Sequence, residues 1–537
     1  MRYLLDSELM AVACALSCLF ATITFVALGV PTLLNATIEE IAEGLDKAVF
    51  TSAQLVRAYQ ARVQETNDHF HAFIQLNPEA EAIASALDLE RKEKGRRSIL
   101  HGIPILLKDN IITLDGTETT SGSTVLLGSK SGSEATIVDR LRQAGVVILG
   151  KSNLSEFAGF RHNHARTGWS ARGGQATGIF WPGQKPSGSS TGSAISVGLG
   201  LATAALGTET VSSIVSPAEK AGVVGFKPTR RETAFRGLIP VSVNLDIIGP
   251  IARTVKDIDL IMTTVEPSRA LLTVSQPEHY PLRGIQVGVF YDPEQPVNMH
   301  KVTAFKCVLE ILQSSRATLV DDVRLPALDE YLSLPSRLKT LVMEIDFKIS
   351  MEAYFRSLTT NPDRLKNLHD LMESIKRDPR ERYPERNIAV MEAASKTSTQ
   401  DPDYLSMLKK EEYFGSTGGI EGALNDAKCK VLISPTSSLT LQRFAAMGGN
   451  PVISVPLGVY PEGTPIEHDE VDGLVTVAPG ITFSLYLYAR KFDDESLLLV
   501  AHVIDKSMQT LKLLKPYKTP QVDLKDQLAG KAPRQKM

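Results

Sequence analysis

The spacing of apolar residues predicts a series of helices and strands along the chain. Thr37 and Glu40 have the spacing of a helix capping box, and apolar residues then recur every three to four positions. Thr51 and Gln54 repeat this pattern, and residues 137–144 predict a further helix. Short apolar runs predict buried strands at residues 103–107, 146–149, 431–435, 451–456 and 481–485. Because helices alternate with strands, we expect a sheet covered by helices.

The middle of the chain carries weaker patterns. Residues 160–220 are rich in Gly, Ser and Thr without clear periodicity, which indicates a functional loop region, apart from a helix expected at 194–206. Residues 260–430 are helix-rich, and the charged stretch 377–386 reads as a solvated loop. From Pro516 onward the chain is polar, and we expect it to be frayed.

The expected organisation is a leader, one folded domain and a tail. We assign residues 1–36 to the leader, 37–515 to the domain and 516–537 to the polar tail.

Residues 9–30 are almost wholly apolar and carry no charge. A helix of this length could cross a bilayer, and Ala27 and Gly29 fit a small-x-small cleavage site. Asn35 begins an Asn-x-Thr acceptor for glycosylation. We therefore expect entry into the secretory pathway, with the leader either cleaved or retained as a membrane anchor. The alternative is a helix packed on the protein's own surface.

Composition excludes several classes of protein. The chain has 537 residues, of which 43% are hydrophobic and 22% charged, as in ordinary globular proteins and unlike collagens or disordered chains. The net charge of −3 provides no basic field, so nucleic acid is not an expected partner. Four cysteines cannot form a disulfide scaffold, and no CxxC, HExxH or Cys/His cluster indicates a zinc site.

Three segments could carry chemistry. Lys108 ends an apolar strand, where desolvation can lower the pKa of its ammonium and make it a base. Residues 186–193 concentrate Ser and Gly around Ser189 and Ser190, and could form a backbone nest or position a catalytic serine. In residues 207–217, successive N–H groups precede Ser213, as an oxyanion hole requires.

Each of these segments also has an ordinary interpretation. Most strand-end lysines simply reach solvent, and a Ser/Gly-rich segment is most often a surface loop. Gly188, Ser190 and Gly192 match the G-x-S-x-G elbow of an esterase. That elbow needs a strand immediately before it, and residues 180–187 do not resemble one.

Together and in this order, the three segments resemble the amidase signature family, whose catalytic group is Ser–cis-Ser–Lys. The resemblance extends over most of the chain and is greatest to fungal secreted-type amidases. It includes residues 119–123, 135–138, 150–156, 168–175, 207–229, 451–458 and 479–483. It implies a single-domain α/β fold, the amidase signature fold, with a large mixed β-sheet sandwiched by helices.

The resemblance also implies roles for individual residues. Ser213 is the nucleophile, Ser189 the bridging serine on a cis peptide bond, and Lys108 the base. It implies no cofactor and no metal. The oxyanion would be held by backbone N–H groups of Thr210, Val211, Ser212 and Ser213.

The chain departs from the family pattern at three places. The family usually has Gly where this chain has Val211-Ser212 and Thr191, and often has Arg at the position of Val215. We expect negative φ at 211 and 212, with the N–H groups still pointing inward. Val215 removes a partner for a substrate carboxylate, which argues against glutamine or malonamate and against an amidotransferase A-type subunit.

We therefore expect an amidase that hydrolyses a carboxylic or fatty acid amide to the acid plus an amine or ammonia. Its partner is a small-molecule amide, with possible membrane association through residues 9–30. The alternatives are a catalytically impaired protein of the same fold, an amidotransferase A-type subunit, and an esterase centred on Ser190. The sequence leaves the particular amide and the oligomeric state open.

Overall fold

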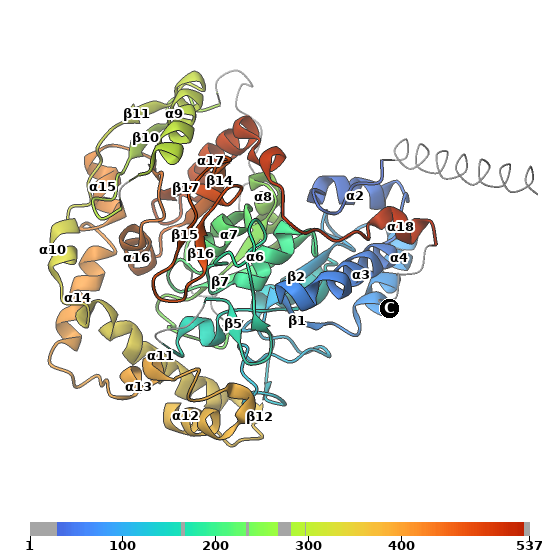
Figure 1. Ribbon diagram of the computed structural model, residues 1–537, viewed down its shortest axis with the longest axis horizontal. Coiled ribbons are helices and arrows are strands. Elements are labelled where there is room, and N and C mark those ends of the chain that lie inside the picture. Colours follow the sequence, from blue (N-terminus) through green and yellow to red (C-terminus); the bar gives the residue numbers. More distant parts are fainter. Residues whose placement is uncertain (1–28, 163–166, 232–235, 267–280, 296, 531–537) are drawn as a thin grey trace, which may run out of the picture.

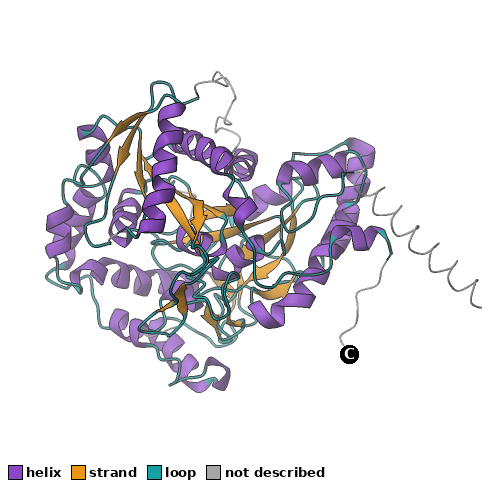
Figure 2. Cartoon of the chain, turned by 45° about the horizontal axis from the view of Figure 1, so that its top comes forward, coloured by secondary structure: helices purple, strands orange, loops and turns teal. Residues whose placement is uncertain are grey.

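A computed structural model describes residues 29–162, 167–231, 236–266, 281–295 and 297–530. Within these ranges, eleven strands form one mixed sheet through the middle of the molecule, with helices on both sides (Figures 1 and 2). This confirms the predicted sheet sandwiched by helices. In spatial order the strands are β1 (Phe73–Leu76), β4 (Val147–Ser152), β2 (Pro104–Lys108), β7 (Ala204–Glu209), β9 (Ile247–Ala252), β8 (Val224–Lys227), β14 (Val452–Val459), β17 (Thr482–Ala489), β13 (Val431–Ser434), β10 (Gln286–Val289) and β11 (Thr318–Val320).

The parallel part of the sheet positions the chemistry. Strand β2 runs parallel to both β4 and β7, while β9 pairs antiparallel with β7. In the β2–β7 register, Leu107 is opposite Leu206. Since parallel strands end at the same edge of a sheet, Lys108 at the end of β2 emerges beside the last residues of β7.

The helices fall into three groups in Figure 1. At one end of the molecule lie α2 (Ile38–Asp46), α3 (Ser52–Phe70), α4 (Ala80–Lys94) and α18 (Leu524–Leu528). Helices packed along the sheet are α5 (Thr136–Gln143), α6 (Thr191–Gly198), α7 (Val215–Ala221), α8 (Val255–Val265), α9 (Met299–Ser314), α15 (Ile420–Asp426), α16 (Leu439–Gly448) and α17 (Asp494–Met508). Along the left and lower edge of Figure 1 lie α10 (Leu328–Ser333), α11 (Leu338–Ser357), α12 (Leu368–Arg377), α13 (Ala389–Ser395) and α14 (Tyr404–Phe414).

Short elements complete the described chain. Three two-stranded sheets pair β3 (Lys130–Ser131) with β12 (Leu358–Thr360), β5 (Trp169–Ser170) with β6 (Gly174–Gln175), and β15 (Glu467–His468) with β16 (Val475–Val477). The 3₁₀ turns in the described ranges are η1 (Glu156–Gly159), η2 (Pro379–Glu381) and η3 (Thr510–Leu513).

The strongest sequence patterns fold as predicted. All five apolar runs become strands of the large sheet, and both capping boxes form, at Thr37 and at Thr51. The predicted helix at 137–144 is α5.

The helix predicted at 194–206 is wrong in its second half. Helix α6 ends at Gly198, and β7 begins at Ala204 with every residue buried. Small apolar side chains suit both a buried helix and a central strand, so composition alone did not separate them.

The prediction of a frayed tail is wrong as far as residue 530. Leu524 in α18 is fully buried, and the guanidinium of Arg62 on α3 donates a hydrogen bond to the carbonyl of Val522. The carboxylate of Glu65 also accepts hydrogen bonds from the backbone N–H groups of Gln521 and Val522. These contacts fix the polar segment on α3.

The stretch 377–386, predicted as a solvated loop, contains one buried anchor. Glu381 is fully buried and forms an ion pair with Arg161, which also pairs with Glu156. Its carboxylate further accepts hydrogen bonds from the hydroxyl of Ser123 (2.6 Å) and the N–H of Thr124 (2.7 Å). One glutamate therefore ties this otherwise exposed stretch to the segment that follows β2.

The predicted leader, residues 9–30, lies outside the described residues except for its last two positions. Among the helices of the described chain, none is both long and apolar enough to cross a membrane.

Candidate active site

Lys108 lies at the carboxyl end of the inner strand β2, where its side chain is buried among hydroxyl groups. Its Nζ lies within hydrogen-bond distance of four oxygens: Oγ of Ser189 (2.7 Å), Oγ1 of Thr208 (2.9 Å), Oγ of Ser190 (3.0 Å) and the carbonyl of Thr208 (3.1 Å). The side chain is fully buried, so water does not compete for these contacts. The predicted base and the predicted bridging serine are therefore brought together.

Burial lowers the pKa of Lys108 to about 7, and the nearby carboxylates of Asp246 and Glu209 partly oppose that shift. A lysine with this pKa is uncharged in a large fraction of molecules near neutral pH, and only the uncharged amine can accept a proton. The environment of Lys108 therefore suits a general base.

Ser189 lies at the start of α6, in the tight segment that connects it to the preceding loop. The Gly188–Ser189 peptide bond is cis, as the resemblance implies. The carbonyl of Ser189 accepts a hydrogen bond from the N–H of Ser155 (3.1 Å). At Gly192, one turn further, a Cβ atom would lie 2.1 Å from the carbonyl of Ala72, so only glycine allows α6 to pack this closely.

Ser190 has the geometry of a structural residue and not of an esterase nucleophile. No strand immediately precedes it; it is the residue before α6. It is fully buried, and its Oγ donates to the carbonyl of Thr208 (3.0 Å) while accepting from Nζ of Lys108 and from the N–H of Thr208. These contacts leave no open approach for a substrate to its hydroxyl.

Ser213 is the most exposed of the three predicted catalytic residues, at 9% against 3% for Ser189 and 0% for Lys108. Exposure thus decreases from Ser213 to Lys108, as expected if Ser213 contacts the substrate and Lys108 acts from the protein interior. The Oγ of Ser213 donates to the carbonyl of Val211 at 3.5 Å. Within the described residues no hydrogen bond joins the hydroxyls of Ser213 and Ser189. The backbone holds the two segments together, because the N–H of Ser190, the residue after Ser189, donates to the Ser213 carbonyl (3.0 Å).

The predicted oxyanion loop, residues 210–213, differs from expectation at one position. Ser212 has φ of +63°, whereas Val211 does not have a positive φ. The expectation of negative φ at both positions is therefore wrong for Ser212. A serine in this left-handed region costs about 1 kcal/mol or more, which the surrounding contacts must offset.

Glu209 supplies those contacts. Its buried carboxylate accepts hydrogen bonds from the N–H groups of Ile214 (2.7 Å) and Val215 (3.2 Å). Burial raises the pKa of this carboxylate and the Ser212 amide opposes the shift, so that amide is directed toward Glu209. No hydrogen bond in the described part of the chain uses the N–H groups of Thr210, Val211 or Ser213, so these are the loop amides available to an oxyanion.

Asp246 is a site residue that the sequence reasoning missed. One oxygen of its fully buried carboxylate accepts from the hydroxyl of Thr210 (2.6 Å), and the other accepts from the N–H groups of Val241 (2.7 Å) and Ser242 (3.0 Å). Burial raises the pKa of Asp246 to about 6, and Lys108 opposes the shift. Asp246 therefore braces the oxyanion loop and acts electrostatically on the base. A lone Asp in an apolar segment was the available signal, because a buried carboxylate needs partners.

Val215 places an apolar side chain where the family often has arginine. It is fully buried and belongs to an apolar cluster with Phe290, Phe414 and Phe444. Its side chain therefore cannot hold a substrate carboxylate as an arginine would.

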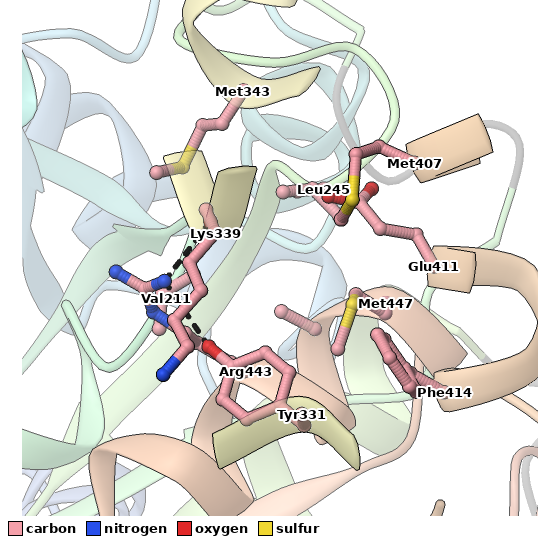
Figure 3. A pocket seen from close by; sticks show the side chains of 11 residues that line it. Val211, Leu245, Tyr331, Lys339, Met343, Met407, Glu411, Phe414, Arg443 and Met447 are labelled. Atoms are coloured by element: carbon pink, nitrogen blue, oxygen red, sulfur yellow. Dashed lines mark hydrogen bonds between the residues drawn. The ribbon is translucent and has the colours of Figure 1, made fainter. Parts of the chain in front are cut away.

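A small pocket with an accessible cavity of about 30 Å³ opens beside the oxyanion loop (Figure 3). Ser213 does not line the pocket, which reaches the loop at Val211. Its apolar wall consists of Val211, Leu245, Met343, Met407, Phe414 and Met447. Among the described residues, no group of three or more His, Cys, Asp or Glu side chains could hold a metal ion.

Comparison with known proteins gives the class. Residues 54–498 match the family model described as Amidase. A protein from Arthroderma benhamiae that is named as an amidase is 33% identical over 92% of this chain and 89% of its own length. The crystal structure of native peptide amidase from Stenotrophomonas maltophilia has a TM-score of 0.77 and 28% identity, covering 91% of this chain and 98% of that one.

A glutamyl-tRNA(Gln) amidotransferase A-type subunit from Chloroflexus aggregans is 36% identical, but over 54% of this chain and 60% of its own length. The chain belongs to the amidase signature family. It is an amide-hydrolysing enzyme.

Proposed function

We propose that this hydrolase cleaves linear carboxylic or fatty acid amides through an acyl-enzyme on Ser213, with Ser189 and Lys108 as its proton relay. The observation that carries the proposal is the 2.7 Å contact between Nζ of the buried Lys108 and Oγ of Ser189. A low pKa at Lys108 makes the uncharged amine accessible near neutral pH, as a base must be.

In the proposed acylation step, Oγ of Ser213 bonds to the amide carbon. Its proton passes to Ser189, whose own proton passes to the amine of Lys108. The negative charge on the carbonyl oxygen is held by the available N–H groups of Thr210, Val211 and Ser213. The relay then returns a proton to the nitrogen, the C–N bond breaks, and the amine leaves.

Water completes the proposed cycle by attacking the ester carbon of the acyl-enzyme. The relay removes a proton from this water and returns it to Oγ of Ser213 as the ester bond breaks, which releases the carboxylic acid. The Ser213–Ser189 hydrogen bond forms in this scheme when substrate draws Oγ of Ser213 away from the Val211 carbonyl.

The buried Val215 favours hydrolysis of amides that carry no carboxylate over a role as an amidotransferase A-type subunit. A substrate with a carboxylate near the scissile bond needs a cation, and the apolar cluster around Val215 offers none.

The proposal is tested with purified protein and a panel of aryl, alkyl and fatty acyl amides. Hydrolysis of at least one class that is lost in Ser213→Ala supports it, with Ser216→Ala as a neighbouring serine control. A wild-type protein inactive on the whole panel would favour the impaired-scaffold alternative, and activity retained by Ser213→Ala would exclude Ser213 as nucleophile.

We further propose that residues 9–30 direct the protein into the secretory pathway, either cleaved near Gly29 or retained as an anchor. Support comes from the apolar sequence and from Asn35, which is exposed and so accessible to glycosylation. Expression in a eukaryotic host tests this: N-terminal sequencing distinguishes cleavage from retention, and glycosidase treatment reveals a glycan. Wholly cytosolic protein with Met1 intact would contradict the proposal.

A further inference from the structure

Glu411 is a carboxylate in the pocket beside the oxyanion loop, and it has no partner among the described residues. It extends from α14 toward Leu245 and Met407, and Figure 3 shows its side chain directed into the pocket. No hydrogen bond or ion pair of the described chain uses its side chain. The residue is only partly exposed, so water does not fully solvate the carboxylate.

The two cations that line the same pocket are already engaged. Nζ of Lys339 donates to the carbonyl of Leu332 (3.1 Å) and lies 5.0 Å from the ring centre of Tyr331. The guanidinium of Arg443 donates to the hydroxyl of Tyr331 (3.1 Å) and to the carbonyl of Lys339 (3.0 Å), as Figure 3 shows. These contacts hold both cations against protein acceptors, whereas the acid has no such partner in the part of the chain that the structure describes.

The surroundings of Glu411 disfavour its anionic form, so a cation placed beside the carboxylate would be stabilising. Burial raises the pKa of Glu411 to about 7, and the carboxylate of Asp346 on α11 adds to the shift, while Arg443 on α16 opposes it. Asp346 itself accepts hydrogen bonds from Ser242 and Asn244 and so is not available to a ligand in the same way.

From this arrangement we infer that Glu411 is a specificity residue, selecting amides whose chain ends in an ammonium or similar cationic donor. The inference rests on the proposed amide hydrolysis and names its substrate class. The apolar wall of the pocket would cover the methylene chain, and the flexible side chains of Met343, Met407 and Met447 can adapt to its length. Val211 joins this pocket to the oxyanion loop, two residues from Ser213.

The test uses pairs of amides that differ only by a terminal ammonium or a terminal methyl group. The acyl pair is 6-aminohexanoyl and heptanoyl 4-nitroanilide, and the amine pair is N-(6-aminohexyl) and N-heptyl benzamide. Rates are measured at pH 8.5, where the ligand is cationic and Glu411 anionic. The variants are Glu411→Gln and, as a control on the same helix, the exposed Glu412→Gln.

In at least one pair, the wild-type protein should favour the ammonium member by about tenfold in kcat/KM. Glu411→Gln should remove this preference while changing the rate on the methyl member less than about threefold, and Glu412→Gln should behave as wild type. A preference for the methyl member in both pairs, or an equal loss on both members in Glu411→Gln, would overturn the inference.

Binding to Ser213→Ala separates this inference from the proposed hydrolysis. Calorimetry with the same pairs reads the preference even if no amide is turned over. Tighter binding of the ammonium member that disappears in the Ser213→Ala, Glu411→Gln double variant supports the inference. Equal binding of both members contradicts it, whatever the protein hydrolyses.

Discussion

Nζ of Lys108 lies 2.7 Å from Oγ of Ser189, although 81 positions separate the two residues in the chain. The contact exists because β2 and β7 run parallel and end together, and because Ser190, the residue before α6, contacts Lys108 and Thr208 at these strand ends. The sheet thus holds the base rigidly, while the nucleophile lies on a loop that follows β7. The proposed proton transfer between Ser189 and Lys108 therefore takes place in the most buried part of the site.

Replacing Lys108 by methionine should abolish most activity while preserving the fold. The change keeps the side-chain volume but removes the proton acceptor, so kcat/KM should fall by about 10²–10⁴-fold. Lys151→Met is the matched control, because Lys151 is also fully buried, with a pKa lowered to about 8, but donates to Ile111 and Thr119. Kinetics and thermal melting on both variants check this, and a near-normal rate in Lys108→Met would exclude the relay.

The rate should depend on pH through Lys108. Below a pH of about 7 the ammonium predominates and cannot accept a proton; above it the neutral amine predominates. We therefore expect kcat/KM to rise as pH increases through about 7 and then to level off. A pH–rate profile on a neutral amide measures this, and a rising limb centred near 10, at the usual lysine pKa, would show that Lys108 is not desolvated during catalysis.

Asp246→Asn should move that rising limb to lower pH. The carboxylate of Asp246 favours the charged form of Lys108, so its removal lowers the pKa of the lysine. The maximal rate should also fall, by about tenfold or more, because an NH₂ donor replaces one of the two accepting oxygens. Either the hydroxyl of Thr210 or the N–H groups of Val241 and Ser242 then lose their acceptor, and the oxyanion loop is less well held.

The control for Asp246 is Asp257→Asn, at another fully buried carboxylate, which accepts from the N–H of Ile38. It should reduce stability without moving the pH profile. An unshifted profile in Asp246→Asn would show that this carboxylate does not act on Lys108.

Ser212→Gly should be tolerated. Glycine adopts the observed φ of +63° without strain, so the variant should be at least as stable as the wild type, with kcat/KM changed less than about tenfold. Ser121→Gly is the matched control, since Ser121 also has positive φ and lies outside the oxyanion loop. A hundredfold gain in Ser212→Gly alone would show that the native loop is malformed and that the wild type is an impaired hydrolase.

Local patterns predicted the fold well where apolar spacing and capping agree, as at Thr51 and in the strand that ends at Lys108. They did not reveal that Glu381 is buried, because its partner Arg161 is 220 positions away. The packing of residues 516–530 depends in the same way on Arg62 and Glu65 of α3. Contacts between residues far apart in the chain leave no local pattern in the sequence.

The site was predicted unevenly. The resemblance named Lys108, Ser189 and Ser213, whereas apolar runs alone indicated only a lysine at the end of a strand. The φ of Ser212 could not be read from the sequence, because it depends on the carboxylate of Glu209 drawing in neighbouring amides. Asp246 was missed because it lies 36 positions after Thr210, just before β9, and only the folded sheet brings the two side chains together.

The most direct test of the account is to identify the serine that becomes covalently modified. The wild-type protein is incubated with a fluorophosphonate, digested, and mapped by mass spectrometry, with Lys108→Met and Ser213→Ala in parallel. We predict a single adduct on Ser213, strongly slowed in Lys108→Met and absent in Ser213→Ala. An adduct on Ser190, or labelling of Ser213 that is as fast without Lys108 as with it, would contradict the Ser213–Ser189–Lys108 relay.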